Sequence, residues 1–157
     1  MTVRISSGLA NAMLGTTGFT TAMNNGVIYL YSGVMPNSAN DAETSGSALL
    51  AKITANSGAF TSGVATNGLQ WNTPVLNVIS SLTGQVWSGV GLIAGYCGWF
   101  RFYANTVVTG ASTTSARFDG RVSGTGGGGE LAISSTSIVV GATISIKSAA
   151  FTLNTGV

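Results

Sequence analysis

The segment YCGWFRFY at residues 96–103 and the segment ARFDGRV at residues 116–122 decide the fold of this chain, and a Thr- and Ser-rich stretch joins them. Aromatic residues flank Arg101 in the first segment, and charged and apolar residues alternate in the second. Alternation with a period of two is typical of a strand, because successive side chains point to opposite faces of the sheet. The two segments therefore predict a long antiparallel hairpin with residues 104–115 as its loop.

The predicted hairpin concentrates charge in a chain that has little of it. Its second strand places Arg117, Asp119 and Arg121 on one face, where they can lie beside Arg101 of the first strand. An arginine that shares a strand face with Trp99 is rarely buried without an acidic partner. We therefore expect Asp119 to be the shared partner of the three arginines.

Composition indicates a single all-β domain. Only 6% of the 157 residues are charged, against about 25% in an ordinary soluble domain, while glycine is frequent at 23 residues and proline rare at 2. Turn-forming and β-branched residues in these proportions favour strands. We expect an antiparallel β-sandwich, with the jelly roll as one candidate topology. A surface so poor in charge is weakly protected against association, which predicts a homo-oligomer.

Several partner and site classes are disfavoured by the sequence. The formal net charge of +2 comes from scattered basic residues, so we expect no nucleic-acid partner, and the longest apolar run is too short to span a membrane. The chain has no histidine, which removes Ser–His, Cys–His and His–metal chemistry. Cys97 lies among aromatic residues and is expected to be a buried structural thiol. The acids Asp41 and Glu43 fit a solvated loop better than a calcium loop. We expect no enzymatic activity, no cofactor and no metal.

The N-terminal segment, residues 1–26, has a helical period and the remainder, residues 27–157, has the patterns of a β domain. Apolar residues of the segment recur three and four positions apart, namely Leu9, Met13, Phe19 and Met23. Helices this short are marginal in water and must dock on something. They either cover the open end of the β domain or form an arm that docks on a partner, and we expect them to contribute more to attachment than to folding.

Motifs spread over most of the chain resemble small structural virion proteins encoded among the head and neck genes of tailed bacteriophages and prophages. These motifs are LANAML at 9–14, NNGVI at 24–28, YSG at 31–33 with Pro36, GWFRF at 98–102, RFDG at 117–120 and LAISSTSI at 131–138. The resemblance implies a virion component that is assembled in the host cytoplasm and binds other virion proteins. It supplies no catalytic residues.

Three roles follow as expectations, and they differ in the partner. The first is a capsid decoration (cement) protein that self-assembles, with a trimer favoured, and binds the major capsid protein. The second is a collar or neck protein that binds neck proteins at the head–tail junction. A third, of another class, is a host-glycan-binding module, because Trp71, Trp87, Trp99 and the tyrosines could stack on sugars. The candidate residues for a structural or interface role are Leu9, Met13, Phe19, Met23, Trp99, Arg101, Arg117, Asp119 and Arg121.

Overall fold

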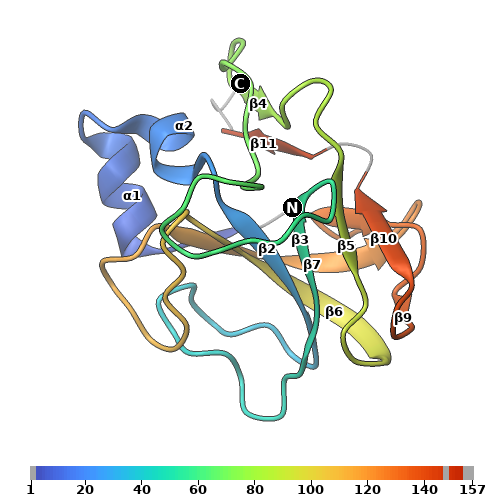
Figure 1. Cartoon of the computed structure of the whole chain (residues 1–157). Helices are drawn as coiled ribbons and strands as arrows, with labels where there is room; N and C mark the ends of the chain where they lie inside the picture. Colours follow the sequence, from blue (N-terminus) through green and yellow to red (C-terminus); the bar gives the residue numbers. More distant parts are fainter. Residues whose placement is uncertain (1–2, 147–148, 154–157) are drawn as a thin grey trace.

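The computed structural model describes residues 3–146 and 149–153, and this part of the chain is mostly β-structure (Figure 1). The helices are α1 (Ser7–Leu14) and α2 (Gly18–Met23). The strands are β1 (Arg4–Ile5), β2 (Val27–Ser32), β3 (Leu49–Ala55), β4 (Val78–Ser80), β5 (Trp87–Val90), β6 (Gly95–Tyr103), β7 (Arg117–Gly124), β8 (Leu131–Ile133), β9 (Ser137–Ile138), β10 (Thr143–Ile146) and β11 (Ala150–Thr152).

Nine of these strands form one sheet, in the order β1-β7-β6-β2-β3-β5-β10, with β8 paired to β7 and β9 paired to β6. Every pair in it is antiparallel except β7 with β8. The sheet curls until β10 lies against β8 without closing. The two-stranded sheet of β4 and β11 packs on the inner face through Ile79 and Phe151. The predicted all-β, sandwich-like fold is confirmed.

The central strands are buried on both faces, because each face carries its own apolar layer. Ile28 and Leu30 of β2 enter the main core inside the curled sheet, together with Phe102 of β6. Tyr29 and Tyr31 of β2 point the other way into a second aromatic cluster. Instead of a second sheet, a loop layer covers this cluster: residues 33–48, 56–68 and 104–116, which pack on it through Met35, Phe60 and Val107.

The predicted hairpin is present as β6 and β7. Arg101 lies opposite Asp119 in the register, and Tyr103 lies opposite Arg117. The register of the two strands leaves residues 104–116 as the connection, one residue longer than the sequence predicts. Trp99, Arg101 and Tyr103 share the face that meets the loop layer, as the period of two requires.

The two predicted helices are also present, and both pack on the core of their own chain. Ser6 caps α1, with its hydroxyl accepting a hydrogen bond from the backbone N–H of Leu9 at 3.1 Å. Leu9 and Met23 are fully buried, and Phe19 stacks on Phe151 with ring centroids 4.7 Å apart. Met13 packs on the same core. Of the two alternatives, the structure has the helices as a cover of the β domain, and the burial of Leu9 and Met23 gives these two candidates a structural place in the core.

One close approach inside the sheet depends on glycine. A Cβ atom at Gly89 of β5 would lie 1.9 Å from the carbonyl oxygen of Lys52 on β3, closer than any real Cβ contact. The backbones of β3 and β5 therefore meet at this point only because residue 89 has no side chain. Neither helix that the structure describes is long and apolar enough to cross a membrane.

Candidate interaction surfaces and the buried ion network

The centre of the loop-covered face holds a buried ion pair. Arg101 donates from Nε to Oδ1 of Asp119 at 2.6 Å and from Nη2 to Oδ2 at 2.7 Å, and both side chains are fully buried. The guanidinium also lies 5.6 Å from the ring of Trp99. Burial raises the pKa of Asp119, and the bonds from Arg101 offset part of that effect. A two-pronged pair of this kind is the geometry that best offsets the desolvation of two charges.

Arg117 lies beside this pair but binds other groups. Its Nε donates to the carbonyl oxygen of Ala39 at 2.6 Å, and its Nη atoms donate to the carbonyl oxygens of Asn40, Asp41 and Val108 at 2.8 to 3.2 Å. The side chain is fully buried and joins the 33–48 loop to the 104–116 loop. The prediction that Asp119 bonds all three arginines is therefore wrong for Arg117.

Arg121, the third arginine, is exposed at the surface. Its backbone N–H donates to Oε2 of Glu130 at 2.7 Å. Among the hairpin candidates for an interface, Arg121 alone is exposed, because Trp99, Arg101, Arg117 and Asp119 are all fully buried. These four residues hold the fold together and are unavailable to a partner.

Glu43 of the 33–48 loop completes the network. Its Oε1 accepts hydrogen bonds from the Tyr103 hydroxyl at 2.6 Å and from Nη1 of Arg101 at 3.2 Å, and its Oε2 accepts from the backbone N–H of Gly110 at 3.0 Å. Burial alone would raise the pKa of Glu43, but these hydrogen bonds and the Arg101 charge hold it below its ordinary value. The prediction of a solvated loop is wrong for Glu43, whose carboxylate fastens that loop to the sheet.

The network satisfies its polar groups internally. Tyr31 adds a hydroxyl contact to Tyr103 at 3.2 Å, and burial raises the pKa of Tyr31 to about 12. Cys97 is buried as predicted, and burial raises the pKa of its thiol to about 12 as well. Within residues 3–146 and 149–153, no group of three or more His, Cys, Asp or Glu side chains is placed to hold a metal ion. The hydrogen bonds and ion pairs of the network therefore hold the loop layer against the sheet.

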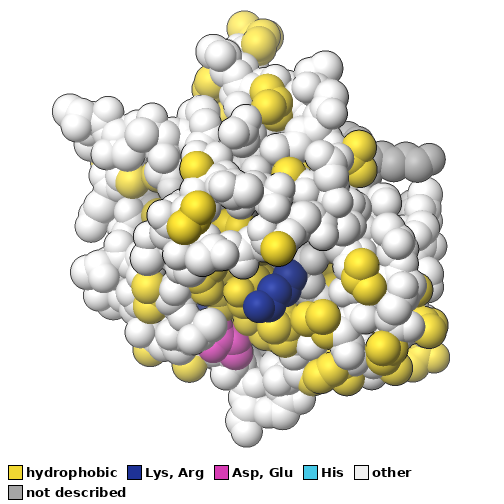
Figure 2. All heavy atoms as spheres, viewed as in Figure 1, with side chains coloured by type: hydrophobic (Ala, Val, Ile, Leu, Met, Phe, Trp, Pro, Cys, Tyr) yellow, Lys and Arg dark blue, Asp and Glu magenta, His cyan; other side chains and the backbone are white. Residues whose placement is uncertain are grey.

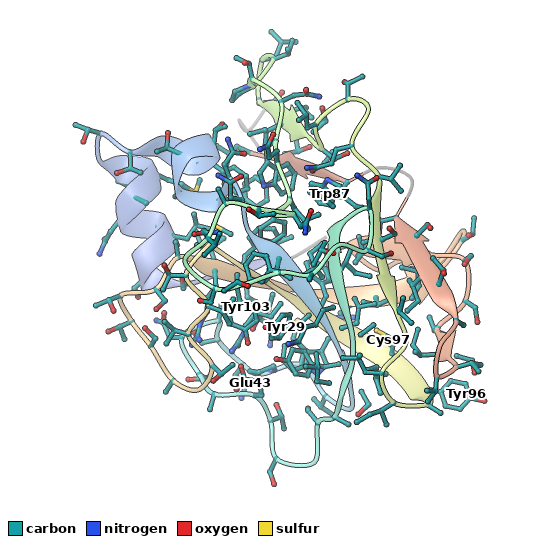
Figure 3. All side chains as sticks on the ribbon, in the orientation of Figure 1. Tyr29, Glu43, Trp87, Tyr96, Cys97 and Tyr103 are labelled. Carbon is teal, nitrogen blue, oxygen red and sulfur yellow. The ribbon has the colours of Figure 1, made fainter. Side chains whose placement is uncertain are left out.

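An exposed apolar surface lies at one end of the molecule, where two loops meet. The backbone N–H of Gly91 donates to the carbonyl oxygen of Ala142 at 2.9 Å, and the N–H of Gly141 donates to that of Gly91 at 2.8 Å. These bonds bring together the end patch, which we define as Val90, Leu92, Ile93, Tyr96, Val139 and Val140, all of them exposed. Tyr96 is the most exposed at 76% and projects from the edge of the molecule in Figure 3.

Figure 2 shows apolar side chains gathered on this side of the molecule, at the lower right of the view. The six residues of the end patch include no charged side chain. β5 stops at Val90, and the apolar residues Leu92 and Ile93 after it lie in an exposed loop. The sequence of an apolar run does not show whether the run is buried or exposed, because that depends on which distant strands pack against it.

A second exposed apolar feature is a tight turn beside β4. Val75 and Val78 exchange two backbone hydrogen bonds, at 2.9 and 3.1 Å, so that Leu76 and Asn77 form the tip. Val75 is 70% exposed and Leu76 is 96% exposed. Leu76 also has a φ of 54°, in the left-handed region that bulky residues rarely adopt. We call Val75 and Leu76 the apolar turn.

A cavity of about 560 Å³ lies between the curled sheet and the β4–β11 pair. Aromatic side chains, including Trp71, Trp87, Phe102 and Phe118, form part of its wall, and Glu130 also lines it. Figure 3 labels Trp87 on this side of the molecule. Trp71, Trp87 and Trp99 are each at most 5% exposed, so the tryptophans that the sequence offers for sugar stacking are not on the surface. No protein-family model, curated protein or solved structure matches the chain.

Proposed function

We propose that this chain is a non-catalytic structural subunit of a tailed-phage virion, in first place a capsid decoration protein that self-assembles and binds the major capsid protein. The observation that carries the proposal is the end patch, six exposed apolar residues without a charge among them. Monomeric soluble proteins rarely expose contiguous apolar surface of this kind, and it usually marks a protein interaction site.

The distribution of charge supports the same reading. Arg101, Arg117 and Asp119 are three of the ten charged residues of the chain, and all three are buried. The surface is therefore poorer in charge than the composition alone indicates. Such a surface favours binding to apolar neighbours over binding to polyanions or ionic ligands.

The buried network supports a structural role over a catalytic one. Its carboxylates, Asp119 and Glu43, accept hydrogen bonds from arginine, tyrosine and backbone donors of the same chain. A general acid or base needs to reach a substrate proton, directly or through one water. The carboxylates of Asp119 and Glu43 are instead used to hold loops on the sheet, which suits a structural protein.

The assignment to a virion rests on the resemblance described above. Two of its motifs, GWFRF and RFDG, lie in the two strands of the central hairpin, β6 and β7. Within a virion, the same end patch would serve a decoration protein on the capsid or a collar protein at the neck. Which of the two positions applies is decided by the location of the chain in the particle.

The test combines location with a variant of the patch. Purified virions are probed for the chain with gold-labelled antibody, and virions stripped of the chain are incubated with purified wild type or Ile93→Asp. A carboxylate in an apolar contact is left without compensation, so we expect at least about tenfold weaker rebinding, equivalent to ~1.4 kcal/mol. Val34→Asp is the matched control, because Val34 is 73% exposed outside the patch. Absence of the chain from virions, or equal rebinding by both variants, would contradict the proposal.

A further inference from the structure

We propose that the apolar turn of one copy of this chain docks in the aromatic cavity of a second copy, and that this contact, repeated head to tail, builds the homo-oligomer. The inference rests on the self-assembly in the proposed function and names the surfaces that carry it. It uses the turn and the cavity rather than the end patch, which is left for other virion proteins.

The first observation is the conflict at Leu76 between residue and conformation. A two-residue turn with positive φ at its first central position is the pattern of a type II′ turn, which favours glycine there. Leucine at that position has a strained φ of 54° and a side chain that is 96% exposed. Neither the backbone nor the solvent favours leucine at this place. Strain kept at an exposed position is typical of a residue that serves an interaction.

The second observation is a receptor of matching chemistry on the same chain. The cavity has about 560 Å³, within the size range of pockets that hold small ligands, and aromatic rings form much of its wall. Thr152 lines the cavity and is exposed, so it lies at the mouth. An isolated valine–leucine pair gains most from burial against rings of this kind.

The third observation is that the turn and the cavity lie at one end of the molecule. Val78 pairs with Thr152, and Asn77 donates from Nδ2 to the carbonyl oxygen of Leu153 at 2.8 Å. Asn77 itself lines the cavity, so the exposed turn borders the mouth, beside β4 and β11 in Figure 1. Copies arranged around an axis at this end can each offer a turn to the next copy and receive one from the last.

The symmetry follows from the two surfaces being different. A contact between unlike surfaces is heterologous, and its repetition gives a closed ring when the rotation closes. A ring of three is the arrangement that agrees with the trimer favoured for a decoration protein. The turn carries no charge, so the contact is insensitive to like-charge repulsion between copies.

The first experiment measures sedimentation of the full chain at micromolar concentration. We expect the wild type to form trimers, and Leu76→Ser to shift the dissociation constant upward by at least about tenfold, the loss of one buried leucine contact. Leu14→Ser is the matched control, because Leu14 is 89% exposed at the end of α1 and remote in sequence from the turn. A wild type that stays monomeric, or equal dissociation constants for the two variants, overturns the proposal.

A second variant separates docking from folding. Leu76→Gly removes the side chain and also relieves the positive φ, so the melting temperature of the dissociated chain rises while association weakens. A leucine that only supports the fold would give the opposite sign, with a lower melting temperature. That result overturns the proposal.

Mixing tests the head-to-tail geometry. Thr152→Trp adds bulk at the cavity mouth and leaves the turn intact, whereas Leu76→Ser does the reverse. Each variant alone is expected to associate at least about tenfold more weakly than the wild type, and an equimolar mixture is expected to give one-to-one heterodimers that do not grow into trimers. A mixture that stays monomeric overturns the contact, as does native mass spectrometry that finds a small molecule filling the cavity. A wild type that stays monomeric yet rebinds normally to virions through the end patch would contradict the ring alone and leave the proposed function standing.

Discussion

Arg101 and Arg117 show two ways in which one chain can bury an arginine. Arg101 faces a carboxylate that neutralises it, whereas Arg117 is held by four backbone carbonyl oxygens from two loops. Burial lowers the pKa of Arg117, and the neighbouring charge of Arg101 lowers it further. The partial negative charge on the carbonyls takes the place of a counter-ion for Arg117, so the fold of the loops depends on this side chain.

At the residue scale, Asp119→Ala should remove the two-pronged partner of Arg101 and leave the buried guanidinium with Glu43 as its remaining acid. We expect the free energy of unfolding to fall by about 3–5 kcal/mol, the usual cost of removing one member of a buried pair. Adding Arg101→Met should recover part of that loss, because no uncompensated charge remains. Urea unfolding of the two single variants and the double variant measures the coupling. Additive losses would mean that the pair contributes nothing beyond its separate residues.

At the scale of elements, the period of two predicted the β6–β7 hairpin, and the side chains of Trp99 and Phe100 lie on the opposite faces that it requires. The helical period of the N-terminal segment likewise predicted α1 and α2, because it depends on neighbours in sequence. β1 was missed because two residues are too few to show a period. The loop layer was not predicted, because every residue has a backbone carbonyl and the sequence therefore does not show that Arg117 binds the carbonyl of Ala39.

The docking of α2 gives the prediction for this scale. Phe19 contacts Trp71 with ring centroids 5.3 Å apart and Phe151 at 4.7 Å, so it joins the helix to two distant segments. Phe19→Ala should lower the free energy of unfolding by about 2–3 kcal/mol, somewhat less than for a fully buried phenylalanine. Leu14→Ala, at an exposed position in α1, should change it by less than ~0.5 kcal/mol. Thermal unfolding by circular dichroism compares them, and equal midpoints would mean that α2 is not part of the cooperative unit.

At the scale of the whole molecule, exposed apolar surface and sparse charge act together. Sixteen large apolar residues are exposed in the part of the chain that the structure describes, and they include the end patch and the apolar turn. The apolar turn and four of the six end-patch residues lie in connections between strands, and Val90 and Tyr96 lie close to the ends of β5 and β6 that flank one of these connections. The molecule therefore presents apolar contacts at two separate places, one for each of the two kinds of partner that we propose.

Association through these surfaces should respond weakly to ionic strength. Charge contacts at a surface are screened over a Debye length of about 8–10 Å at physiological salt, whereas apolar contacts are not. We expect the dissociation constant of the oligomer to change by less than about threefold between 0.05 and 0.5 M sodium chloride, and to fall in ammonium sulfate, which strengthens apolar burial. Sedimentation across this range is the measurement. A steep weakening with sodium chloride would point to ionic contacts instead.

The contact between Phe19 and Phe151 also sets an order of events during synthesis. Ribosomes add roughly 5–20 residues per second, so the partner of Phe19 emerges on the order of ten seconds after it. β1 likewise waits for Phe118 and Asp119 of β7, with which it pairs. Until Phe151 emerges, Phe19 of α2 lacks one of its aromatic partners and can contact only the partners synthesised earlier, such as Trp71. A nascent chain that has not yet reached Phe151 therefore exposes more of the apolar surface of α2 than the folded protein does.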